Sequence, residues 1–154
     1  MNEPRSSVEP GSSVEAVAAP ALPGLQLGAA DYVVVVVGDL DASMEFYTET
    51  LGIPLAHRSG PFAQLDTGTT RIGLFEREVM AETIGRPIDG PADPTRPAFE
   101  LGFHVDSVDT ALEIVVARGV TVVVPATDRA WGQRTAYIAD PDGNLIELVE
   151  TLYV

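Results

Sequence analysis

The apolar positions of the chain fall into two blocks with the same order of elements. In the first block, "DYVVVVVGDL" (31–40) holds five consecutive valines, whose branched side chains favour a strand. "DLDASMEFYTETLG" (39–52) follows with apolar residues at helical spacing and a glycine at its end, which predicts a helix. The runs "IPLAHRS", "FAQLDTG" and "TRIGLFERE" then predict three short strands. The block therefore predicts a β-α-β-β-β module over residues 30–76.

The second block repeats this order over residues 99–151. "FELGFHVDSVD" predicts a strand, "VDTALEIVVARG" a helix, "VTVVVPAT" a strand, and "RTAYIADPDGNLIELVE" a hairpin of two further strands. Residues 77–98 are rich in Pro, Gly and Asp near their end, and they predict a linker with one short helix in "VMAETIG".

The two blocks also align residue by residue. "GDLDASMEF" (38–46) matches "DSVDTALEI" (106–114) at an offset of 68, and "QLDTGTTRIGLF" (64–75) matches "YIADPDGNLIEL" (137–148) at an offset of 73. An internal repeat of this kind predicts two copies of one structural unit. We therefore expect an α+β fold in which two tandem β-α-β-β-β modules form curved mixed sheets around a cleft.

Composition narrows the setting of this domain. Residues 1–29 are rich in Ser, Pro, Ala and Glu, so we expect a flexible tail before a single domain over residues 30–154. The absence of cysteine excludes disulfides and thiolate chemistry and fits a cytoplasmic location. The net charge of −14 disfavours binding to nucleic acid or to a membrane surface. It would attract a cationic small molecule, although maintaining solubility is the simpler explanation of the acidity.

The repeat, the "DLDASMEFYTETLGI" element and above all "AYIADPDGNLIELVE" resemble the vicinal oxygen chelate superfamily. This superfamily contains glyoxalase I, extradiol dioxygenases, methylmalonyl-CoA epimerase and bleomycin-type antibiotic resistance proteins. The resemblance covers roughly residues 30–151. It implies a homodimer in which modules are often exchanged between chains. In members with a metal, it also implies ligands at four equivalent points, on the first and last strand of each module.

The resemblance places those four points on two acidic and two non-ligating residues. The two points of the second module fall on Glu100 and Glu147, and the offsets of 68 and 73 carry them to Tyr32 and Leu74 in the first module. Neither a neutral phenol nor a leucine is an expected ligand for a divalent metal. We therefore expect no metal cofactor, and Glu100 and Glu147 are the ligands if a divalent metal does bind.

Several further residues are candidates for contact with a small molecule. His104 shares strand parity with Glu100, so the two side chains are expected on one face. Aromatic residues at strand positions or at a pocket rim can stack on a flat or cationic ligand. The complete set of predicted ligand-binding residues is Tyr32, Phe62, Glu100, His104, Trp131, Tyr137 and Glu147.

The sequence supports three hypotheses for function. The favoured one is a metal-free protein that sequesters an aromatic or cationic, antibiotic-type ligand in a dimer-interface cleft, as a drug-resistance protein does. The alternative is a metal-dependent lyase, isomerase or dioxygenase in which Glu100 and Glu147 hold the ion and His104 assists. The third is a structural or regulatory partner with an empty cleft. Ordinary packing explains each aromatic residue equally well, and a histidine without chemistry is the simpler interpretation of His104.

Overall fold

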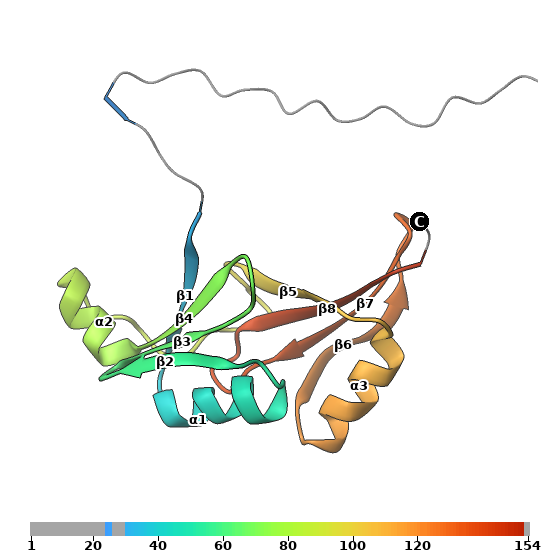
Figure 1. The fold of residues 1–154 in the computed structure, drawn as a ribbon, viewed down its shortest axis with the longest axis horizontal. Helices are drawn as coiled ribbons and strands as arrows, with labels where there is room; N and C mark the ends of the chain where they lie inside the picture. Colours follow the sequence, from blue (N-terminus) through green and yellow to red (C-terminus); the bar gives the residue numbers. More distant parts are fainter. Residues whose placement is uncertain (1–23, 26–29, 153–154) are drawn as a thin grey trace, which may run out of the picture.

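The computed structural model describes residues 24–25 and 30–152, which form two β-α-β-β-β modules. Figure 1 shows their two sheets next to each other, with the main helix of each module on the same side of the sheets. The predicted two-module α+β fold is confirmed. The tail predicted for residues 1–29 lies outside the described residues except for Gly24 and Leu25.

Each module builds one four-stranded mixed sheet. The first sheet has the order β1-β4-β3-β2 and the second has the order β5-β8-β7-β6, and in both the first strand pairs in parallel with the last. The elements of the first module are β1 (Tyr32–Val37), α1 (Leu40–Glu45), η1 (Phe46–Thr50), β2 (Leu55–Ser59), β3 (Phe62–Leu65) and β4 (Arg71–Glu76). Those of the second are β5 (Glu100–His104), α3 (Val108–Ala117), β6 (Thr121–Asp128), β7 (Gln133–Ala139) and β8 (Leu145–Thr151).

Matching helix caps confirm the repeat at an offset of 68. The side chain of Asp39 accepts a hydrogen bond from the backbone N–H of Ala42 at the start of α1. Ser107 does the same for Thr110 at the start of α3. Such caps satisfy backbone donors that a helix start leaves open. The predicted first helix differs in one respect, since its second half, η1, is a π-helix.

One apolar core joins the two modules on the helix side of the sheets. Along β1, Val35 and Val37 are fully buried, because alternate side chains of a strand point to the same face. The core cluster combines residues of the first module with residues of the second, among them Val35, Tyr47, Leu74, Leu101, Val115 and Ile146. The opposite side of each sheet, called here the open face, carries the partly exposed side chains.

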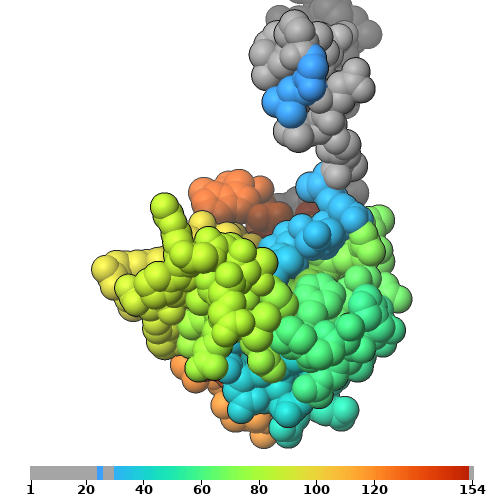
Figure 2. All heavy atoms as spheres, turned by 90° about the vertical axis from the view of Figure 1, so that its left-hand side faces the viewer, coloured from blue at the N-terminus to red at the C-terminus, as the bar shows by residue number. Residues whose placement is uncertain are grey.

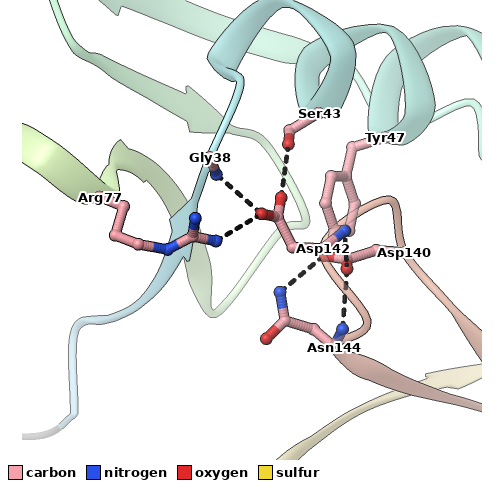
Figure 3. Close-up of polar contacts among 7 residues, drawn as sticks. All are labelled: Gly38, Ser43, Tyr47, Arg77, Asp140, Asp142 and Asn144. Atoms are coloured by element: carbon pink, nitrogen blue, oxygen red, sulfur yellow. Dashed lines mark hydrogen bonds and ion pairs between the residues drawn. The ribbon is translucent and has the colours of Figure 1, made fainter. Parts of the chain in front are cut away.

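The turn between β7 and β8 holds the modules together through two buried carboxylates (Figure 3). Asp142 Oδ1 accepts the backbone N–H of Gly38 at 2.7 Å and the Arg77 guanidinium at 2.8 Å, and its Oδ2 accepts the Ser43 hydroxyl at 3.3 Å. These three donors lie in the first module or directly after it. A buried charge needs such partners, so this carboxylate fixes the turn to the first module.

Asp140 accepts hydrogen bonds both from the turn that contains it and from the first module (Figure 3). It accepts the backbone N–H groups of Asp142 and Asn144, and it accepts the Tyr47 hydroxyl at 2.7 Å. Burial, followed by the charge of Asp140, raises the pKa of Tyr47 far above its ordinary value, so this phenol remains a donor. Asp140 therefore links the turn to the end of the first helix.

The segment between the modules begins with the predicted short helix. α2 (Arg77–Ile84) starts directly after β4, two residues before the predicted "VMAETIG", and ends at Gly85 in the left-handed conformation. Figure 2 shows α2 and the residues after it standing out on one side of the molecule. The far end of this segment contacts the second module, because a Cβ at Gly143 would lie 2.4 Å from the Ala92 carbonyl oxygen. Within the described residues, no helix is long and apolar enough to cross a membrane.

Candidate functional site

The open face of the second sheet carries a small acidic cluster. Glu147 at the middle of β8 is the register partner of Gly102 on β5 and of Tyr137 on β7. The Tyr137 hydroxyl donates to Glu147 Oε1 at 3.0 Å, and a Cβ at Gly102 would lie 3.4 Å from Glu147 Oε2. Glycine at this position leaves the room that the carboxylate occupies. Glu100 begins β5 on the same face.

The electrostatics of this cluster show that its acids are close enough to interact. Partial burial raises the pKa of Glu100, and the charge of Glu147 raises it further. Partial burial also raises the pKa of Tyr137, with the hydrogen bond to Glu147 as the second cause. In the described part of the chain, neither Glu100 nor Glu147 forms an ion pair. The cluster therefore presents two carboxylates without an ion pair among the described residues, and the charge of Arg129 acts on its Tyr137 member.

A hollow of about 560 Å³ lies beside the acidic cluster, between the two modules. Glu100 and His104 border it from β5, while Thr67, Thr69 and Thr70 border it from the turn before β4. Both predicted residues on β5 thus border one space, which all five residues of this strand line. The threonine hydroxyls add donors and acceptors that the sequence interpretation did not include.

The open face of the first sheet is aromatic. The Phe62 ring lies directly over Gly73, where a Cβ would be only 2.6 Å from a ring carbon. The rings of His57 and Phe75 flank Phe62, each with a centroid 6.1 Å away. Tyr32 begins β1 with 57% of its surface exposed, and the Arg71 guanidinium lies 5.6 Å from its ring centroid.

The structure brings some predicted residues together and keeps others apart. Glu100, Tyr137 and Glu147 form the acidic cluster, with His104 on the same face of β5, whereas Tyr32 and Phe62 lie on the other sheet. Trp131 lies in the turn before β7, is 68% exposed and donates its indole N–H to the side chain of Gln133 at 2.8 Å. It is accessible to a ligand but stands outside the cluster.

The strand register corrects one equivalence predicted from the sequence. Val34 matches Gly102 at the offset of 68, and its register partner on β4 is Gly73. Glu147 therefore corresponds to Gly73, and the predicted counterpart, Leu74, is wrong by one residue. Leu74 is fully buried on the helix side, since neighbouring residues of a strand face opposite ways. The counterpart of Glu147 still has no ligating atom, and the Phe62 ring fills its place.

Comparison with known proteins identifies the family of this chain. Residues 29–148 match the sequence model of the Glyoxalase/Bleomycin resistance protein/Dioxygenase superfamily. The chain belongs to this superfamily. YraH of Bacillus subtilis, an uncharacterised relative, is 35% identical over 75% of this chain and 93% of its own. A bleomycin resistance protein of Geobacillus stearothermophilus is 29% identical over 75% of this chain and 92% of its own.

Solved structures of the Glyoxalase/Bleomycin resistance protein/Dioxygenase superfamily agree with the fold. A glyoxalase/bleomycin resistance protein/dioxygenase from Nocardioides superposes with a TM-score of 0.71 and 28% identity, covering 83% of this chain and 86% of that one. A family enzyme from Burkholderia phytofirmans gives a TM-score of 0.68 at 26% identity, covering 81% of this chain and all of the other. The likeness extends over both modules.

The ligand positions of metal-containing members of the superfamily do not fit a metal here. Of the four points, Glu100 and Glu147 offer carboxylates, Tyr32 has an arginine over its ring, and Gly73 offers nothing. Among the residues that the structure describes, no three His, Cys, Asp or Glu side chains are grouped so that they would hold a metal ion. Sites for zinc and similar metals have three or more protein ligands.

The sequence interpretation missed Arg129 at this site. Its guanidinium lies 5.9 Å from the Tyr137 ring centroid, and its Nε donates to the Thr135 hydroxyl at 2.8 Å. Arg129 therefore supports the ring of Tyr137 and leaves the carboxylates open. An arginine in the loop before a strand gives no sequence signal for such a contact.

Proposed function

We propose that this protein binds and sequesters a flat, cationic small molecule in a cleft of a homodimer, as an antibiotic-resistance protein does. The observation that supports this most is the acidic cluster: Glu100 and Glu147 lie on one open face, and neither forms an ion pair with a residue that the structure describes. A cationic ligand would lower the repulsion between these carboxylates and donate a charge-assisted hydrogen bond to Glu147. His104 and Trp131 contribute contacts at the edges of the cleft.

The aromatic face of the first module supplies the complementary half of the proposed cleft. Tyr32 and Phe62 offer ring faces to a planar ligand, and such stacking contributes roughly 0.5–1.5 kcal/mol per pair beyond area burial. Superfamily members typically work as dimers, which supports a cleft with walls from two chains. In this arrangement, Tyr32 and Phe62 of one chain face the acidic cluster of the other.

The relatives support a binding role for the same face. The similarity to bleomycin resistance proteins extends over three quarters of the chain. The loss of two of four ligand positions, one of them filled by Phe62, favours binding without metal-assisted catalysis. Resistance through sequestration is therefore the function that this site supports best.

A titration with matched probes tests the proposal. Proflavine, bleomycin and the anionic 9-anthracenecarboxylate are each titrated into the full-length protein by calorimetry, and elution volume is measured with and without ligand. We expect the cationic probe proflavine to bind, 9-anthracenecarboxylate to bind at least tenfold more weakly, and the protein to elute as a dimer. Glu147→Gln should weaken proflavine binding about tenfold, since a hydrogen bond to a charged group contributes about 1.5–3 kcal/mol.

The matched control is Glu113→Gln on α3, which removes an exposed carboxylate on the helix side. This control should bind proflavine as the original chain does. Equal losses in both variants would mean that overall charge, and not the acidic cluster, attracts the ligand. Binding by neither proflavine nor bleomycin would contradict the proposed function.

The metal-dependent enzyme remains the second candidate because Glu100 and Glu147 lie on one face of paired strands, where the charge of Glu147 adds to burial in raising the pKa of Glu100. Elemental analysis before and after soaking with Zn, Ni, Mn and Fe(II) separates the two functions. We expect well below one equivalent of metal per chain after buffer exchange, because two carboxylates alone hold such ions weakly. One retained equivalent that Glu147→Gln abolishes would instead favour the enzyme.

A further inference from the structure

A second hollow lies on the helix side of the molecule, at the junction of the two modules. Its volume is about 320 Å³, within the lower range of small-molecule sites. Leu51 and Ile53 border it from the first module, while Phe103 and α3 border it from the second. Phe103 and His104 border both this hollow and the one beside the acidic cluster, so the two are neighbours, but Glu100 borders only the latter.

The lining of this hollow differs from the rest of the surface in charge. Most of its side chains are apolar, its polar members are Thr50 and His104, and Arg118 at the end of α3 is its charged member. Among the described residues that line it, none is acidic, although the chain has 23 Asp and Glu against 9 Lys and Arg. In so acidic a protein, a carboxylate-free apolar hollow with an arginine at its edge is suited to an anionic head group.

The wall next to Arg118 has an unusual backbone. η1 is a π-helix, closed by a hydrogen bond of 2.9 Å from Leu51 N–H to the Phe46 carbonyl. π-Helices are rare and are found frequently at functional sites. Arg118 reaches across the module junction and donates through one terminal nitrogen to the carbonyls of Glu49 and Thr50. Figure 1 shows α3 beside the end of this helical segment.

We propose that this junction hollow binds a small monocarboxylate with an apolar body. The carboxylate pairs with the outward edge of the Arg118 guanidinium, which the backbone carbonyls hold in place. The apolar body packs on Leu51, Ile53 and Phe103 and replaces water there. Ile114, with 46% of its surface exposed, stands at the mouth of the hollow.

Three eight-carbon probes test the head group. Sodium octanoate, 1-octanol and octylammonium chloride are titrated separately into the full-length protein. We expect saturable binding of octanoate at one site per chain, with 1-octanol about threefold to fivefold weaker because an exposed ion pair contributes little. Octylammonium should bind at least tenfold more weakly than octanoate. Equal binding of octanoate and octylammonium, or heats that do not saturate, would overturn the proposal.

Substitutions on α3 locate the site. Ile114→Glu places a charge at the mouth and should weaken octanoate binding at least tenfold. Val116→Glu is the matched control, since Val116 is 50% exposed on the same helix and does not line the hollow. It should bind octanoate as the original chain does. Ile114→Trp fills the mouth without a charge and repeats the test if Ile114→Glu folds poorly.

The remaining outcomes also decide the proposal. Arg118→Gln should weaken octanoate threefold to fivefold and leave 1-octanol unchanged, and equal loss for both probes would overturn the role of the charge. If Ile114→Glu converts a dimer to a monomer and octanoate binds to neither, the hollow is an interface between copies and the proposal fails. Glu147→Gln should leave octanoate binding intact, which separates this site from the cleft.

Discussion

The two modules have the same strand topology and differ in the side chains on their open faces. On the open face of the first, Gly73 lies under the Phe62 ring, and the surroundings are aromatic. In the second, Glu147 stands at the position that corresponds to Gly73, lies against Gly102 on the neighbouring strand and accepts the Tyr137 hydroxyl. In each module, a glycine makes room for one large or charged neighbour. The two glycines lie on different strands of the repeat, Gly73 on β4 and Gly102 on β5, so each module makes this room in its own way.

The hairpin turns of the two modules differ in the same way. Asp140 in the second module is buried and accepts hydrogen bonds from its own turn and from Tyr47 of the other module. Asp66 is its counterpart in the first module, and its carboxylate is exposed and accepts only the local Gly68 N–H among the described contacts. The β7–β8 turn thus connects the two modules, whereas the described hydrogen bond of Asp66 stays within its own β3–β4 turn.

Removing the Asp140 carboxylate from the β7–β8 turn should have the largest effect on the stability of the fold. Asp140→Asn places an amide opposite two donors, the Tyr47 hydroxyl and the Asn144 side chain. We expect a loss of about 2–4 kcal/mol in the free energy of unfolding, because buried donors left without an acceptor cost about 1–3 kcal/mol each. Asp66→Asn should change it by less than about 0.5 kcal/mol. Urea unfolding monitored by circular dichroism measures both, and equal effects would contradict the contrast between the turns.

The glycines of the two open faces should respond differently to an added methyl group. At Gly73 a Cβ would lie 2.6 Å from the Phe62 ring, so Gly73→Ala should cost about 1–3 kcal/mol. At Gly102 the nearest atom is 3.4 Å away and belongs to the flexible Glu147 side chain, so Gly102→Ala should cost less than about 1 kcal/mol.

A double-mutant cycle identifies the cause of the cost at Gly73. Phe62→Ala removes the ring that a Cβ would meet, so the alanine at position 73 should cost almost nothing in that background. The unfolding free energies of the two single variants and the double variant give the interaction energy directly. Additive effects would mean that the Phe62 ring is not the cause of the cost at position 73.

The amino-acid pattern was sufficient for the fold and only partly sufficient for the site. The valine run, the helix caps and the repeated order of elements act locally, and each strand appears where its pattern predicts it. Tyr137 and Glu147 also meet, because the register of a hairpin is a short-range property. Glu100 joins them through the parallel pairing of β5 with β8, which the repeated order of elements indicates but no local pattern determines.

Two features were beyond the reach of the pattern. The sequences "TRIGLF" and "GNLIEL" were aligned one residue away from the register of the strands. The alignment therefore assigned Leu74, and not Gly73, as the counterpart of Glu147. The bond from Gly38 to Asp142 spans 104 residues, and the "DPDGN" letters predict only a turn. Both depend on how strands and loops that are distant in sequence pack together, and local hydrophobic periodicity does not predict such packing.

The smallest expected effect concerns the charge of Glu100, whose counterpart in the first module is the uncharged Tyr32. Because burial and Glu147 raise its pKa in the folded state, the folded chain binds more protons than the unfolded chain between the two pKa values. Glu100 therefore lowers stability as the pH rises from below about 4.5 through its folded pKa, and the penalty is complete above that value. Glu100→Gln removes this penalty, so the variant should gain stability relative to the original chain at pH 7 and lose that advantage at pH 4. Urea unfolding of both proteins at the two pH values measures the difference, in which the titration of other carboxyl groups largely cancels. An advantage that is equal at both pH values would show that Glu100 does not share the field of Glu147, and the acidic face would then be two separate carboxylates.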